Sequence, residues 1–162
     1  MEIHIASGVG KGPTTLAAFD SALYDAGIAN YNLLCLSSVI PTGSNITVYP
    51  ERVPEIQGRW GDRLYVVMAH MRTAQPNQEA WGGIGWVQDE TTKRGLFVEH
   101  EGYSEESVRQ DITDSLGALM LTRNIDFGPI NMEVRGTICE DQPACALVAA
   151  VYESSGWETA GI

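Results

Sequence analysis

Two adjacent serines, Ser37 and Ser38, stand at the end of an apolar segment that begins at about Asn30, and Pro41 follows them. Adjacent hydroxyls at a strand end are common in turns, because serine side chains readily bond nearby backbone groups. A serine pair at a strand end can also be a place where the backbone cuts itself. The residue types permit both interpretations.

Acidic side chains after another apolar run are a second candidate for chemistry. Glu99 and Glu101 flank His100 directly after the segment Gly95–Val98. In an extended strand the two carboxylates share one face and the histidine takes the other. The apolar approach predicts partial burial of Glu99, which would suit a general acid. A solvated strand end accounts for the same pattern.

The remaining motifs point away from nucleotide and metal chemistry. The segment Gly8–Thr15 is rich in glycine and contains Lys11, but this lysine precedes a glycine and the spacing of a phosphate-binding loop is not met. We expect a tight turn leading into a helix there. The three histidines stand far apart, and Cys35, Cys139 and Cys145 lack the spacing of a zinc site, so no metal site is expected.

Composition and charge describe an acidic globular protein of 162 residues, which fits a single domain. Ten basic side chains stand against twenty-one acidic ones, and the net charge of −11 disfavours nucleic acid and anionic lipid as partners. The odd number of cysteines, with Cys35 and Cys145 in apolar runs, indicates buried thiols in a reducing compartment. Neither a signal peptide nor a run of about 20 apolar residues is visible, so we expect a cytoplasmic location and no membrane span.

The pattern of apolar residues and turns predicts the elements that must position these groups. Two helices among runs of strands indicate an α+β layered sandwich. The first helix should end at Gly27 and bury a stripe formed by Leu16, Phe19, Leu23 and Ala26. In chain order we expect a strand over 2–7, a helix through 26, a strand over 30–36, an irregular connection over 41–62, strands over 63–71, 82–87 and 95–101, a helix over 104–123, strands over 131–139 and 144–152, and a polar tail from 154.

Five segments together resemble the pyruvoyl-dependent arginine decarboxylase family, in the family's order and over nearly the whole chain. Short strings of alanine, glycine and leucine are common singly, whereas their ordered combination around a Ser-Ser pair is specific. The chain departs from the family pattern within Gly27–Asn30, where Ala29 stands in place of a glycine. The segments are Leu16–Leu23, Ala26–Leu33, Leu36–Pro41, Val98–Gly102 and Cys145–Ala150.

The resemblance implies an enzyme that matures by cutting itself between Ser37 and Ser38. The single domain, residues 1–162, would separate into a small β chain, 1–37, and a large α chain, 38–162, which stay intertwined in a four-layer αββα sandwich. Ser38 would become a covalent pyruvoyl group, which serves as the cofactor. The implied reaction is the decarboxylation of L-arginine to agmatine and carbon dioxide, used in polyamine synthesis or in acid resistance.

The same resemblance implies roles for individual residues. Ser38 and Glu99 would be catalytic, with Glu99 as the proton donor, and Asn32 would take part in processing and in the active site. Asp20 would face the guanidinium group of arginine. Copies of the chain would assemble as a trimer or a dimer of trimers, with sites between subunits. Substrate contacts are implied for Asp20, Leu23, Ala29, Tyr31 and Ser37.

Two alternatives stay open at this point. The first keeps the chemistry but changes the substrate to another amino acid. The second is a small-molecule binding protein of the same fold that never cleaves, in which Ser37 and Ser38 only end a strand.

Overall fold

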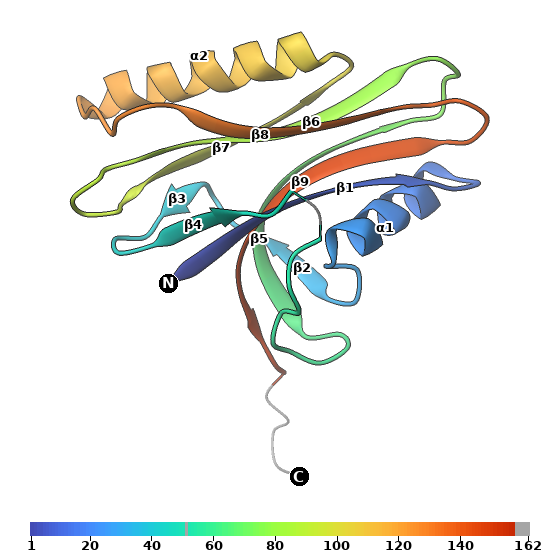
Figure 1. Cartoon of the computed structure of the whole chain (residues 1–162), viewed down its shortest axis with the longest axis horizontal. Helices are drawn as coiled ribbons and strands as arrows, with labels where there is room; N and C mark the ends of the chain where they lie inside the picture. The colour runs from blue at the N-terminus through green and yellow to red at the C-terminus, as the bar shows by residue number, and fades with distance from the viewer. Residues whose placement is uncertain (51, 158–162) are drawn as a thin grey trace.

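Nine strands and two helices form in the part of the chain that the computed structural model describes, residues 1–50 and 52–157. They build four layers in the order helix, sheet, sheet, helix (Figure 1), so the expected α+β sandwich of αββα type is confirmed. In chain order the elements are β1 (Glu2–Lys11), α1 (Thr15–Ala26), β2 (Asn32–Cys35), β3 (Val39–Ile40), β4 (Asn45–Val48), β5 (Arg63–Thr73), β6 (Glu79–Gln88), β7 (Gly95–Gly102), α2 (Glu105–Arg123), β8 (Asn131–Ile138) and β9 (Ala144–Ser155).

Each sheet packs one face against a helix and the other face against the second sheet. The five-stranded sheet has the order β2-β5-β9-β1-β4, and the four-stranded sheet has the order β3-β7-β6-β8. Buried apolar side chains fill the space under α1, the space between the sheets and the space under α2. Because β2 and β3 each lie at the edge of a different sheet, the chain crosses between the sheets in the short segment that joins them.

Most of the glycine-rich segment near the N-terminus is strand, which corrects the turn predicted for Gly8–Pro13. β1 continues through Lys11, where it pairs with Ala144 of β9. A side chain at Gly8 or Gly10 would overlap backbone atoms of α1, so these glycines allow the helix to lie directly on the strand. The composition is typical of a turn, and tertiary packing overrides it.

Small residues of α1 contact the glycines of β1, and they determine which face of the helix is buried. The helix begins after Thr14, whose hydroxyl caps it, and ends as predicted at Gly27, in the left-handed conformation (φ 88°). Leu16 is 65 % exposed, which contradicts its predicted burial. Alanines fit against the glycines of β1 where a leucine would not. The buried face consists of Ala18, Ala22, Leu23 and Ala26.

The predicted irregular connection over 41–62 contains a short strand. β4 pairs in parallel with β1, from Asn45 opposite Glu2 to Val48 opposite Ile5. A strand of only four residues at a sheet edge is hard to predict from local sequence, because β4 forms by pairing with β1, which is distant in the sequence. At the other end β9 extends through Ser155, so the predicted tail begins later, and residues 158–162 lie outside the described part.

The second half of the chain follows the prediction closely. The strands predicted over 82–87 and 95–101 form as β6 and β7 and pair as an antiparallel hairpin, and the Ser104 hydroxyl caps α2 by accepting a hydrogen bond from the Ser107 N–H. On the inner side of α2, Val108, Ile112 and Leu116 are buried and Leu119 is partly buried. Among the described residues, neither helix is long and apolar enough to cross a bilayer.

Replacing Gly10 by alanine should destabilise the fold by about 1–3 kcal/mol, because the methyl group would overlap backbone atoms of Ala18 and Ala22 that cannot move aside. Gly117→Ala is the matched control, since position 117 lies on α2 with open space around it and alanine is favoured over glycine in a helix by up to about 1 kcal/mol. Urea unfolding measures both variants. Equal stability of the two would contradict the close packing of α1 on β1.

Candidate active site at the crossing between the sheets

The two serines lie where the chain leaves the edge of one sheet for the edge of the other. The N–H of Leu36, after the end of β2, donates to the carbonyl of Val66 in β5 (2.8 Å). β3 begins at Val39 and pairs with β7. Ser37 and Ser38 are therefore held from both sides, by the five-stranded sheet before them and by the four-stranded sheet after them.

A tight turn is centred on Ser38. The N–H of Val39 donates to the Ser37 carbonyl oxygen (2.9 Å), and such a bond between residues i and i+2 closes a three-residue turn. The N–H of Phe97 in β7 donates to the Ser38 carbonyl (2.8 Å) and fixes the next peptide group. A donor on a carbonyl oxygen stabilises the negative charge that develops there during nucleophilic attack. The Ser37 carbonyl is thus polarised beside the Ser38 hydroxyl.

The Ser38 hydroxyl donates a hydrogen bond of 2.7 Å to Oε2 of Glu99. This length is typical of a hydroxyl bonded to a carboxylate. β7 stays extended here, so His100 turns to the opposite face, where its Nε2 lies 2.7 Å from the Ser115 hydroxyl of α2. The predicted separation of faces is confirmed. The predicted partial burial of Glu99 is wrong, because its side chain is exposed at the edge of the single chain, where two-residue β3 leaves β7 uncovered.

A shallow cavity of about 370 Å³ opens beside this pair, and Ser37, Ser38, Glu99 and Arg123 of α2 all line it. The arrangement combines a hydroxyl nucleophile, a carboxylate that can accept its proton and a polarised carbonyl next in the chain. These are the groups that cutting the backbone between the serines requires. Within the described residues no group of three or more histidine, cysteine, aspartate or glutamate side chains is placed to hold a metal ion.

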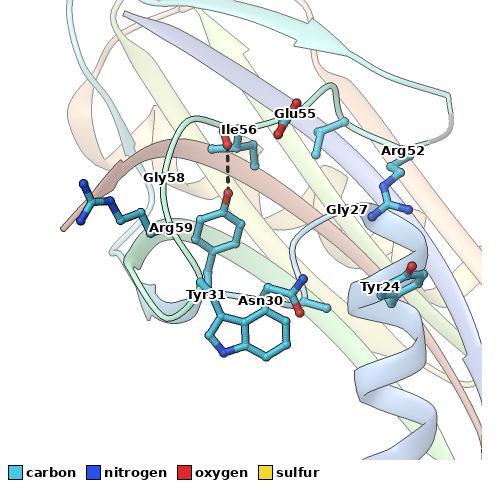
Figure 2. Close-up of a pocket in the computed structure, with 12 residues that line it drawn as sticks. Tyr24, Gly27, Asn30, Tyr31, Arg52, Glu55, Ile56, Gly58 and Arg59 are labelled. Atoms are coloured by element: carbon cyan, nitrogen blue, oxygen red, sulfur yellow. Dashed lines mark hydrogen bonds between the residues drawn. The ribbon is translucent and has the colours of Figure 1, made fainter. Parts of the chain in front are cut away.

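Four other residues predicted to bind substrate are not part of the lining of the cavity beside the serines. Asp20 is exposed on α1 and forms no ion pair or hydrogen bond with another residue that the structure describes, whereas Leu23 is buried beneath the same helix. Ala29 and Tyr31 line a separate hollow of about 470 Å³. Figure 2 shows this hollow, in which the Tyr31 hydroxyl donates to the Ile56 carbonyl (3.0 Å).

The hollow in Figure 2 carries mixed charge. Arg52, Arg59 and Glu55 line it, and the guanidinium of Arg52 lies 5.0 Å from the centroid of the Tyr24 ring. Two cations against one anion give a guanidinium ligand no electrostatic advantage there. Asp20, the predicted guanidinium partner, is not part of the lining. Within one chain this hollow is a poor site for arginine.

Asn32 is also separated from the serine pair. It begins β2, and its side-chain amide donates to the Gly61 carbonyl (2.6 Å). An extended strand rises about 3.3 Å per residue, so β2 puts about 10 Å between the backbones of Asn32 and Cys35. Cys35 is exposed, so its predicted burial is wrong. It lies in β2, an edge strand, and no other described strand pairs with the outer edge of β2. Of the predicted site residues, all of which the structure describes, a single chain therefore brings together only Ser37, Ser38 and Glu99.

Three hydrogen-bond donors that hold the serine turn were not predicted from the sequence. Val39 and Phe97 act through main-chain N–H groups, which no side-chain pattern reveals. Tyr152 of β9 is buried, and its hydroxyl donates to the Val39 carbonyl (3.0 Å). A buried tyrosine usually finds a partner for its hydroxyl, so a tyrosine at the end of the apolar run 144–152 is the one available signal.

Sequence similarity to known proteins extends over nearly the whole chain. The model of the pyruvoyl-dependent arginine decarboxylase family matches residues 2–156. A pyruvoyl-dependent arginine decarboxylase of Halobacterium salinarum is 38 % identical over 157 residues, 94 % of this chain and 94 % of that protein. Proteins of the same name from Thermoplasma volcanium (32 % identical, 75 % of this chain and 66 % of the relative) and Methanothermobacter thermautotrophicus (29 %, 94 % and 96 %) are similar as well. The chain therefore belongs to the pyruvoyl-dependent arginine decarboxylase family, carboxy-lyases that carry a covalently bound pyruvoyl group.

Proposed function

We propose that the chain cleaves itself between Ser37 and Ser38 and then decarboxylates L-arginine to agmatine and carbon dioxide. The observation that carries the first step is the 2.7 Å hydrogen bond from Ser38 Oγ to Glu99, beside a Ser37 carbonyl that already accepts the Val39 N–H. Arginine as the substrate is supported by the names of the relatives in Halobacterium salinarum and Thermoplasma volcanium.

Cleavage begins when the Ser38 hydroxyl oxygen attacks the Ser37 carbonyl carbon while its proton passes to Glu99. The bond from that carbon to the Ser38 nitrogen breaks, the nitrogen takes up a proton, and an ester now joins the two residues. Removal of the α-proton of residue 38 expels the Ser37 carboxylate and leaves a Cα–Cβ double bond. Water then adds and ammonia departs, which leaves a pyruvoyl group at position 38. The sequence of steps consumes one water and releases one ammonia.

Glu99 has a second role in the decarboxylation. The pyruvoyl group supplies a ketone carbonyl that holds the substrate amine and accepts the electron pair left by carbon dioxide. The substrate α-carbon then needs a proton, and Glu99 lies within hydrogen-bond reach of the side chain of residue 38. The same carboxyl group therefore accepts a proton during cleavage and returns one during turnover.

The residues for substrate recognition belong, in this proposal, to a neighbouring copy of the chain. Asp20, Tyr31 and Asn32 lie away from Ser38 within one chain, and Asp20 and Asn32 are exposed. The exposure of Glu99 leaves the site open to water, whereas electrostatic catalysis gains from water exclusion. A homo-oligomer, a trimer or a dimer of trimers, would cover Ser38 of one copy with α1 of another and set Asp20 against the guanidinium.

Ser38→Ala should abolish cleavage, because the attacking oxygen is lost. Ser37→Ala should still cleave, because residue 37 contributes only its carbonyl group to the reaction. Denaturing electrophoresis of the two purified variants, followed over days, distinguishes one band from two. Fragments from Ser38→Ala, or equal failure of both variants, would contradict the assigned nucleophile.

Glu99→Gln should slow cleavage about 100-fold, since the amide can accept the Ser38 hydrogen bond but cannot take the proton. Glu101→Gln is its control, because Glu101 shares the strand and the face of Glu99 without bonding Ser38. The rate is measured from the disappearance of the uncleaved chain. A loss of similar size at both positions would attribute the effect to the charge of the strand end.

Asp20→Ala should raise the KM for arginine about 10- to 100-fold and leave cleavage unaffected, because a carboxylate paired with a guanidinium contributes about 1.5–3 kcal/mol. Asp111→Ala, an exposed acid on α2, controls for net charge. Release of carbon dioxide from arginine, lysine and ornithine is the measurement. Unchanged arginine kinetics in Asp20→Ala would remove the guanidinium assignment, and preference of the unsubstituted protein for another amino acid would replace arginine as the substrate.

A further inference from the structure

One buried side chain links the two sheets at the serine turn. Tyr152, in β9 of the five-stranded sheet, is 9 % exposed. Its hydroxyl donates to the carbonyl of Val39, in β3 of the four-stranded sheet (3.0 Å). The hydrogen bond therefore joins the residue directly after Ser38 to a long central strand of the opposite layer.

A β-bulge places Tyr152 outside the regular ladder. The register between β5 and β9 shifts at this point, because Val151 pairs with Val66 while Glu153 pairs with Tyr65. Tyr152 is thus the extra residue of β9, without a partner in β5. Bulges bend a strand and re-aim one side chain, and they recur beside active sites. Here the extra residue delivers a phenol to the serine turn.

The surroundings of the phenol keep it in place and protonated. Its ring meets the Phe97 ring edge to face, with centroids 6.2 Å apart. Burial, and then the negative charge of Glu99, raise the pKa of Tyr152 to about 12. The hydroxyl is therefore protonated at neutral pH and can donate to the Val39 carbonyl.

Cleavage would change what holds residue 38. Before it, the chain is bonded to the five-stranded sheet through Leu36 and to the four-stranded sheet through β3. After it, residue 38 is a chain end, and β3 is a terminal strand of two residues. Chain ends fray unless specific bonds tie them down. The bonds that remain at this end are the β3–β7 pairing, the Phe97 N–H to the Ser38 carbonyl and the Tyr152 hydroxyl to the Val39 carbonyl.

We infer that Tyr152 is a positioning residue for this enzyme. Its hydroxyl fixes the turn around Ser38 before cleavage, and it keeps residue 38 beside Glu99 after cleavage. The inference rests on the proposed function, because both effects presuppose that the bond between the serines breaks. Tyr152 acts through the backbone of Val39 and needs no contact with the substrate.

Tyr152→Phe tests the inference by removing one oxygen atom and keeping the ring against Phe97. We expect cleavage to slow about tenfold, which corresponds to the loss of one hydrogen bond. We expect kcat per cleaved chain to fall about tenfold for arginine at unchanged KM. Tyr49→Phe is the matched control, since it removes a tyrosine hydroxyl that lies near His4 (3.2 Å), and it should change both rates less than twofold.

A second measurement does not depend on activity. In the Ser38→Ala protein, which should stay uncleaved, adding Tyr152→Phe should speed hydrogen exchange at the amides of Val39 and Ile40 about tenfold, whereas adding Tyr49→Phe should not. Cleavage, turnover and exchange within twofold of the parent proteins would overturn the role of Tyr152. So would general unfolding of Tyr152→Phe, which would assign the hydroxyl to overall stability. A parent protein that never cleaves would instead contradict the proposed function itself, and with it the inference.

Discussion

The chemistry of this chain depends on how two sheets hold one short crossing. Leu36 is bonded to the five-stranded sheet and the Ser38 carbonyl to the four-stranded sheet, so the peptide between the serines has little freedom. The turn closed by the Val39 N–H polarises the Ser37 carbonyl, and the β3–β7 pairing brings Glu99 to 2.7 Å from the Ser38 hydroxyl. An amide is a poor electrophile, and in the proposed cleavage this fixed arrangement would supply the nucleophile, the base and the polarising donor together.

The packing of α1 on β1 determines where the predicted substrate-binding acid, Asp20, lies relative to the serines. Glycines in β1 and alanines in α1 bring helix and strand into close contact, which leaves Asp20 on the outer surface of the helix. Glu99 is exposed as well, so the cavity beside the serines is open to water, and among the described residues that line it Glu99 is the one acid. Assembly of several copies would change both features, because a neighbouring copy can exclude water from Glu99 and can place its own α1, which carries Asp20, beside the serines.

The sequence predicted correctly those elements that are determined by local features such as helix caps and turns. Gly27 ends α1, Ser104 caps the start of α2, and the hairpin of β6 and β7 follows from two apolar runs joined by a polar turn. Prediction failed where distant packing decides: Gly10 lies in a strand because α1 covers it, and β4 exists because β1 pairs with it. At the site, residue type and position made the serine pair and Glu99 candidates, and the resemblance to the family implied their roles. The Val39 and Phe97 donors are main-chain groups whose positions only the folded structure defines.

The intact mass of the purified protein under denaturing conditions shows whether the chain cleaves itself. We expect two masses that divide the chain between Ser37 and Ser38. The small fragment should end in a free carboxylate, and the large fragment should begin with a pyruvoyl group in place of serine. A single full-length mass that persists after long incubation would contradict the proposed cleavage, because the hydroxyl, the carboxylate and the polarised carbonyl would then lie together without reacting.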